Sequence, residues 1–198
     1  MSGTDFCLQI GTGSLVEPAP FFLSVHKAGS TLQSDVVETL CEWFGLSFIN
    51  IPAQLHVQGV LVRDCPLEVV PLLEQSTVCT GFREPWLLRF IRRYGHSPKI
   101  LLLRDPRDVA VSCYFSTLHH PLPSSGRARN AMLNARSKAT ELTISEFVTE
   151  GQADWIMLRM RAFLEQAADY PNFKITRYED VILKKKALVP RACERTKG

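Results

Sequence analysis

Lys27, Gly29, Ser30 and Thr31 are the residues best suited to chemistry, because they share one short loop that follows an apolar run. The stretch 21–31 reads FFLSVHKAGST, and a helical pattern begins at its end. A glycine lets backbone approach a ligand closely, and a helix start offers unpaired N–H groups and the positive end of the helix dipole. The loop therefore predicts a phosphate-binding site.

The order of residues in this loop differs from that of an ordinary P-loop. That motif reads G-x-x-x-x-G-K-[ST], with glycine before the lysine, whereas here Lys27 precedes the loop's only glycine. A small-molecule kinase of the P-loop class is an alternative in which ILLLRD, residues 100–105, would be a metal-binding strand end. The missing glycines argue against it, and activity that requires ATP and magnesium would favour it.

A second group suited to anion binding follows the most apolar strand pattern of the chain. The segment 99–116 reads KILLLRDPRDVAVSCYFS, with Arg104 at the end of the strand and Ser112 eight positions later on a helix. A guanidinium fork and a hydroxyl suit a terminal phosphate, which arginine can bind through two hydrogen bonds. Asp105 is expected to cap this helix and Pro106 to occupy its first position, with Asp108 favourable for the helix dipole.

Strands and helices alternate along the chain, which predicts an α/β fold of parallel βαβ units with ligands at the carboxyl ends of the strands. Residues 47–63 predict one or two short strands and loops. Other strands are expected at the run before Lys27 and at 76–82, 99–103 and 173–176, and helices from the loop to Gly45, over 86–94, from Pro106 to about Leu118, over 129–138, 144–150 and 152–169, and after 178–180.

Two of these helices carry broad apolar patterns. Leu32, Val36, Leu40 and Trp43 recur at helical spacing, the pattern of a helix face that packs on a core. The helix over 152–169 is expected to be mostly core packing, on the evidence of Trp155, Ile156, Leu158, Met160, Phe163 and Leu164.

Three elements in this order resemble the sulfotransferase family. Its loop for the 5′-phosphosulfate reads P-K-[SA]-G-[ST]-[ST], with His26 here in place of the proline. Its strand followed by R-[DN]-P carries a serine eight residues after the arginine, and a late Y-E-D segment matches ITRYEDV at 175–181. The resemblance implies a P-loop-like three-layer fold with a central parallel sheet flanked by helices. It also implies 3′-phosphoadenosine 5′-phosphosulfate (PAPS) as co-substrate and no metal.

The resemblance also implies a role for each matching residue. Lys27, Ala28, Gly29, Ser30 and Thr31 would hold the 5′-phosphosulfate, Arg104 and Ser112 the 3′-phosphate, and Tyr178 would lie near the adenosine. Lys27 would be catalytic, because its ammonium meets charge that grows on the leaving oxygen.

The acceptor, a hydroxyl or amine on a small molecule, lipid or carbohydrate, needs a general base. Glu84 is the leading candidate, because FREP at 82–85 resembles the family's stretch near the acceptor, with Arg83 in place of lysine. His56 and His26 are alternatives, whereas His96, His119 and His120 are expected to be loop or helix-end residues that nothing in the sequence places beside Lys27.

Length and composition favour one domain over 1–183, followed by a basic tail over 184–198 that is expected to be disordered. The formal charge of +3 belongs to that tail, which has six basic residues and one acidic residue, so nucleic acid is not an expected partner. Six cysteines without close pairing predict a reducing, cytoplasmic setting, and no apolar run is long enough to span a membrane.

The late R-K-G-x-x-G-D-W-type loop of the family has no counterpart, so the sequence is expected to be a C-terminally shortened sulfotransferase. A nucleotide-binding but catalytically impaired fragment is therefore a further alternative. The whole interpretation requires Lys27 and Arg104 to lie at one site, because one donor molecule carries both anionic ends.

Overall fold

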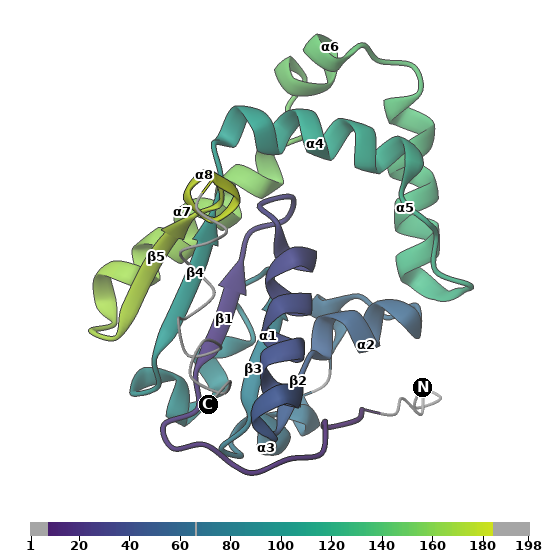
Figure 1. Ribbon diagram of the computed structural model, residues 1–198. Helices are drawn as coiled ribbons and strands as arrows, with labels where there is room; N and C mark the ends of the chain where they lie inside the picture. Colours follow the sequence, from purple (N-terminus) through teal and green to yellow (C-terminus); the bar gives the residue numbers. More distant parts are fainter. Residues whose placement is uncertain (1–7, 66, 184–198) are drawn as a thin grey trace, which may run out of the picture.

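The computed structural model describes residues 8–65 and 67–183, so the predicted tail over 184–198 lies outside the described residues. Five strands form one parallel sheet in the order β2-β3-β1-β4-β5 (Figure 1). They are β1 (Phe21–Ser24), β2 (Phe48–Ile49), β3 (Val78–Phe82), β4 (Lys99–Leu103) and β5 (Phe173–Arg177). Helices flank this sheet, which confirms the predicted α/β class.

Helices cover both faces of the sheet, with α1 (Ser30–Phe44) in front of β1 and β3 and α7 (Asp154–Asp169) behind β4 and β5 (Figure 1). The helix α4 (Pro106–His119) leaves the end of β4 and leads to α5 (Gly126–Ala139) and α6 (Ile144–Thr149). Shorter helices are α2 (Ile51–Val57), α3 (Val70–Leu73) and α8 (Tyr178–Leu183), with 3₁₀ turns at Val62–Asp64, Leu67–Val69, Leu88–Phe90 and Arg92–Gly95.

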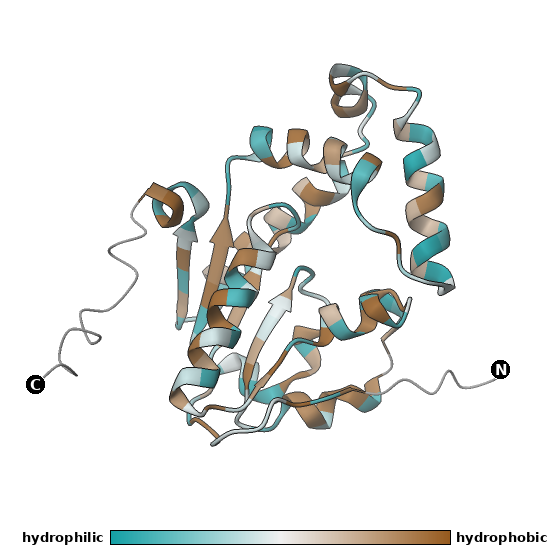
Figure 2. Ribbon diagram, turned by 45° about the vertical axis from the view of Figure 1, so that its right-hand side comes forward, coloured by the Kyte–Doolittle hydropathy of each residue, from teal (hydrophilic) through white to brown (hydrophobic). Residues whose placement is uncertain are grey.

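The core lies mainly between the sheet and the helices behind it. Phe21, Leu23 and Leu101 are completely buried there, and Figure 2 shows β4, the strand that leads into α4, as hydrophobic. A smaller cluster joins Val37 and Cys41 of α1 to Val78 of β3. Among the described residues no helix is long and apolar enough to cross a membrane.

The sheet register places three chain segments at one edge. Ser24 pairs with Leu102, and Leu103 pairs with Arg177, so β1, β4 and β5 end side by side. The residues that follow these strands are the Lys27 loop, Arg104 and Tyr178. Parallel pairing therefore brings the three segments that were predicted to contact the donor to the carboxyl edge of the sheet, as expected for an α/β fold.

Two predicted elements differ in type from the structure. Residues 51–57 are the helix α2 and not a strand or loop, because Asn50 caps it through a 3.1 Å bond from the Ala53 N–H and Pro52 suits its first turn. Residues 86–94 contain two 3₁₀ turns and not one helix.

The two apolar helix patterns also differ from their predicted packing. On α1, Val36 is 49% and Trp43 71% exposed, while Ser34, Val37 and Cys41 are buried. The Ser34 hydroxyl lies 3.1 Å from that of Thr80 in β3, so small side chains let the helix approach the sheet. On α7 only Ile156 and Phe163 are buried, so the prediction that this helix is mostly core packing was wrong.

Candidate functional site

The loop between β1 and α1 is a tight turn held by its own backbone. The Ala28 N–H donates to the Val25 carbonyl at 3.1 Å, and Ala28 is completely buried. Lys27 has a φ of 64°, which is uncommon for a residue with a side chain. Gly29 has a φ of 93°, and a Cβ built there would lie 2.6 Å from the Tyr178 ring, so only glycine fits.

Lys27 is half-buried and points toward α4. Its Nζ donates a 2.8 Å hydrogen bond to the Ser116 hydroxyl. Burial lowers the pKa of Lys27, and the nearby positive charge of Arg83 lowers it further. Ser116 was not predicted from the sequence, although it lies one helical turn after Ser112 and therefore on the same face of α4.

Arg104 contacts both the loop and Tyr178. Its Nη1 donates to the Lys27 carbonyl at 3.4 Å, and its guanidinium carbon lies 4.8 Å from the centre of the Tyr178 ring. It also forms a 3.5 Å ion pair with Asp108, while its Nε is buried with no hydrogen-bond partner. Lys27 and Arg104 are therefore neighbours and do not lie on opposite sides of the molecule.

The start of α8 is fixed to the end of β4. The Glu179 carboxylate accepts a 2.9 Å hydrogen bond from the Asp105 N–H, and this bond is the main cause that lowers the pKa of Glu179. Asp105 in turn caps α4 by accepting from the Arg107 N–H at 2.9 Å, as predicted. Glu179 thus holds Tyr178 beside Gly29.

The remaining predicted phosphate ligands differ in their exposure. Ser30 is buried and Thr31 is exposed at the start of α1. Ser112 is half-buried, and among the described residues its hydroxyl has no hydrogen-bond partner. The structure therefore brings Lys27, Gly29, Arg104 and Tyr178 into direct contact, while Ser112 lies on α4 outside this contact set.

Glu84 belongs to an adjacent cluster that includes α7. Arg159 forms a 2.7 Å ion pair with Glu84, lies 3.4 Å from the His26 Nδ1 and stacks on Trp155 at 4.4 Å. Burial is the main cause that lowers the pKa of His26 well below its usual value, and Arg83, Arg159 and Lys27 add to it. Sequence reasoning missed Arg159, because the pattern of its helix was attributed to core packing.

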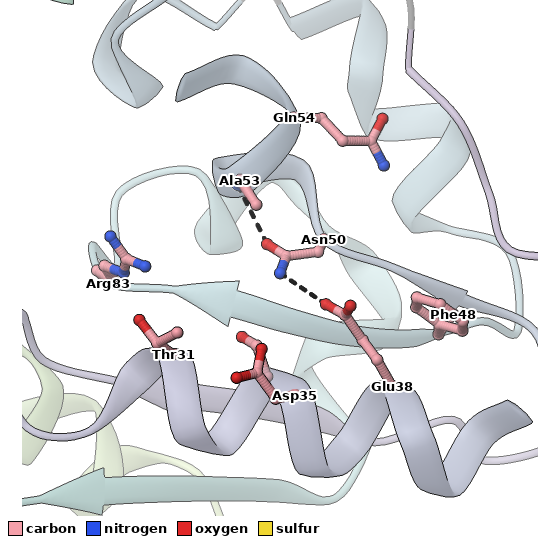
Figure 3. Close-up of a pocket in the computed structure, with 9 residues that line it drawn as sticks. Thr31, Asp35, Glu38, Phe48, Asn50, Ala53, Gln54 and Arg83 are labelled. Atoms are coloured by element: carbon pink, nitrogen blue, oxygen red, sulfur yellow. Dashed lines mark hydrogen bonds between the residues drawn. The ribbon is translucent and has the colours of Figure 1, made fainter. Parts of the chain in front are cut away.

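Arg83 is a guanidinium without a hydrogen-bond or ion-pair partner among the described residues, and its Nε is buried. Burial lowers the pKa of Arg83. With Thr31 it borders one end of a pocket of about 300 Å³ between α1, α2 and β3 (Figure 3). Asn50 lies inside that pocket and donates to Glu38 at 2.8 Å.

These contacts concentrate positive charge at the carboxyl edge of the sheet. Lys27, Arg83, Arg104 and Arg159 have two carboxylate partners between them, Glu84 and Asp108. Buried donors without partners, such as the Nε atoms of Arg83 and Arg104, carry a free-energy cost that a bound anion would relieve. The arrangement is suited to binding a ligand with several negative charges. In the part of the chain that the structure describes, no group of three side chains could hold a metal ion.

No protein-family model matches the chain, and no curated protein matches it significantly. Among solved structures, the chain is similar to mouse sulfotransferase SULT7A1 complexed with PAP, with 15% sequence identity and a TM-score of 0.47. The match covers 91% of this chain and 59% of the mouse chain, so this chain spans about 59% of that protein's length.

Proposed function

We propose that the chain binds PAPS and transfers its sulfuryl group to a hydroxyl or amine acceptor. The observation that carries this proposal is the contact of the Lys27 loop with Arg104 and Tyr178 at the ends of three neighbouring strands. Lys27 and Arg104 give two cationic groups at one site, as a donor with an anion at each end requires.

The residues of this edge fit such a donor. The buried Nε of Arg104 has no partner, and the ring of Tyr178 beside it offers a flat surface for a base. Arg104 and Ser112 would bind the 3′-phosphate, and the loop residues Lys27 to Thr31 would bind the 5′-phosphosulfate. Gly29 lets the loop backbone pass directly beneath the Tyr178 ring, where a side chain would not fit.

In the transfer, the Lys27 ammonium would stabilise the negative charge that grows on the bridging oxygen of the leaving nucleotide. An interaction that strengthens only in the transition state is commonly worth several kcal/mol. For this, the Lys27 ammonium would give up its hydrogen bond to the Ser116 hydroxyl and donate to the bridging oxygen instead. Glu84 could act as the predicted general base only if binding of the acceptor separates its carboxylate from Arg159, with which it forms an ion pair.

Calorimetric titration with 3′-phosphoadenosine 5′-phosphate, compared with the nucleotide lacking the 3′-phosphate, tests donor recognition. The intact protein is expected to prefer the 3′-phosphate, and Arg104→Ala is expected to remove that preference, a loss of about 1.5–3 kcal/mol for a charged hydrogen bond. Lys27→Ala should weaken both nucleotides. Arg92→Ala, an exposed arginine in the turn before β4, is the matched control and should bind both normally.

An Arg104→Ala variant that keeps the preference for a 3′-phosphate would refute the assignment of that residue. Turnover with labelled PAPS and a panel of small-molecule, lipid and carbohydrate acceptors then separates an enzyme from a nucleotide-binding, catalytically impaired fragment. Turnover with ATP and magnesium in place of PAPS would favour the small-molecule kinase.

A further inference from the structure

We infer that His120, paired with His56, is the group that receives the proton of the acceptor. This inference rests on the proposed function and adds to it a catalytic residue at the C-terminal end of α4. The two imidazole rings face each other from the end of α4 and from α2, with centroids 6.0 Å apart and planes inclined by 51°.

Backbone contacts hold the two histidines together. The Gly59 carbonyl, just after α2, accepts a 3.1 Å hydrogen bond from the Ala128 N–H of α5, and a Cβ at Gly59 would lie 2.2 Å from the Ser125 carbonyl oxygen. The end of α2 therefore abuts the start of α5. On the other side, Arg136 of α5 donates to the carbonyls of Thr117 and His120 and so fixes the end of α4.

The pair is linked to Lys27 through Ser116. Ser116 accepts the hydrogen bond of the Lys27 ammonium at 2.8 Å. The His120 N–H donates to the Ser116 carbonyl at 2.9 Å, so His120 follows Ser116 by one helical turn on the same face of α4. The imidazole thus lies one helical turn from the hydroxyl that binds the Lys27 ammonium, the cation that we propose faces the leaving oxygen.

Burial and the positive charges around the pair lower the pKa of both imidazoles. Partial burial is the main cause that lowers the pKa of His120, and the positive charges of Lys27, His56, Arg83 and Arg136 add to it. Burial and Arg83 lower the pKa of His56. A neutral imidazole at neutral pH has a lone pair that can accept a proton.

The other candidate bases are engaged in the cluster of α7. Glu84 forms its 2.7 Å ion pair with Arg159, and Arg159 lies 3.4 Å from the His26 Nδ1. Arginine has no acceptor atom, so the His26 Nδ1 can only accept in this contact, and its lone pair is occupied. His120 is only partly buried and reaches the surface, so it can return its proton to water.

In the proposed transfer, the acceptor oxygen forms a bond to the sulfur of PAPS while the bond from sulfur to the bridging oxygen breaks. The electron pair of that bond remains on the 5′-phosphate of the leaving nucleotide, beside Lys27. The proton of the acceptor hydroxyl goes to an imidazole nitrogen of His120 and then to solvent.

The test is the pH profile of kcat/KM for sulfuryl transfer by wild type, His120→Gln, His56→Gln and Glu84→Gln. His120→Gln is expected to lower kcat/KM about 100-fold, the low end of general-base contributions, and to remove the acidic limb of the profile. His56→Gln should move that limb to higher pH, because His56 lowers the pKa of His120. His119→Gln, an exposed neighbour, is the control and should behave as wild type.

Nucleotide binding by calorimetry separates the two proposals. His120→Gln is expected to bind 3′-phosphoadenosine 5′-phosphate with wild-type affinity, so that its loss appears in turnover alone. A wild-type profile for His120→Gln, together with loss of the acidic limb in Glu84→Gln, would overturn the inference and leave the proposed function intact. Failure of wild type to turn over PAPS with any acceptor would refute both, and failure to bind the nucleotide would refute the donor site itself.

Discussion

Gly29→Ala is expected to destabilise the protein by more than the cost of its backbone conformation. Two independent features require glycine at this position. Its φ of 93° is left-handed, and a Cβ there would lie 2.6 Å from Cδ2 and 2.7 Å from Cε2 of Tyr178. Left-handed backbone costs a residue with a side chain about 1–2 kcal/mol. The ring must also move, which disturbs its contact with Arg104 and adds about 1–2 kcal/mol. The expected total is about 3 kcal/mol.

Gly45→Ala is the matched control, because Gly45 ends the same helix with a φ of 61° and has nothing within 4 Å of a built Cβ. Gly45→Ala should lower the free energy of unfolding by about 1 kcal/mol, which is the cost of the left-handed backbone without any side-chain collision. Urea denaturation of both variants measures the difference. In a Tyr178→Ala background, Gly29→Ala should cost little more than Gly45→Ala, because the colliding ring is gone.

Equal losses of stability in Gly29→Ala and Gly45→Ala would contradict the predicted collision with Tyr178. A double-mutant cycle in which Tyr178→Ala does not reduce the cost of Gly29→Ala would contradict it as well. Either outcome would mean that the Tyr178 ring does not rest on the loop, so that α8 would not contact the candidate site through this residue.

Two further predictions concern the core. Lys99 is buried, and burial lowers its pKa from a usual value near 10.5 to about 8, so the folded chain releases that proton at lower pH than the unfolded chain. The free energy of unfolding should therefore rise by up to about 3 kcal/mol between pH 8 and 10.5. Urea titrations of Lys99→Met should show a flatter rise, and the same pH dependence in wild type and variant would contradict the prediction. On α1, Val37→Ala should cost about 2 kcal/mol of unfolding free energy. Trp43→Ala should cost under about 0.5 kcal/mol, since Trp43 is 71% exposed. A larger loss for Trp43→Ala than for Val37→Ala would mean that the predicted face with Val36 and Trp43 packs on the sheet after all.

The sequence predicted the elements whose local signals agree with their packing. Residues 99–103 form an unbroken apolar strand at the centre of the sheet, and Asp105 with Pro106 marks the start of α4, so both ends of this unit were predicted correctly. The α2 helix was missed, because seven residues between short apolar runs carry little periodicity and its cap, Asn50, was not recognised. On α1 the larger apolar residues occupy an exposed side, because close approach to the sheet requires small residues such as Ser34.

The residues of the candidate site also differ in how far they could be predicted. The proximity of Lys27 and Arg104 could be predicted, because they lie in the segments that follow β1 and β4, and parallel pairing brings the ends of these strands together. Arg159, Ser116 and the facing pair of His56 and His120 could not, because their positions depend on how α4 and α7 return over the sheet. A helix face has a readable period, but its direction relative to a loop from another strand is set only by tertiary packing. Residues that follow strands therefore suffice to predict which loops meet at the sheet edge, whereas the side chains that helices bring to that edge cannot be predicted in this way.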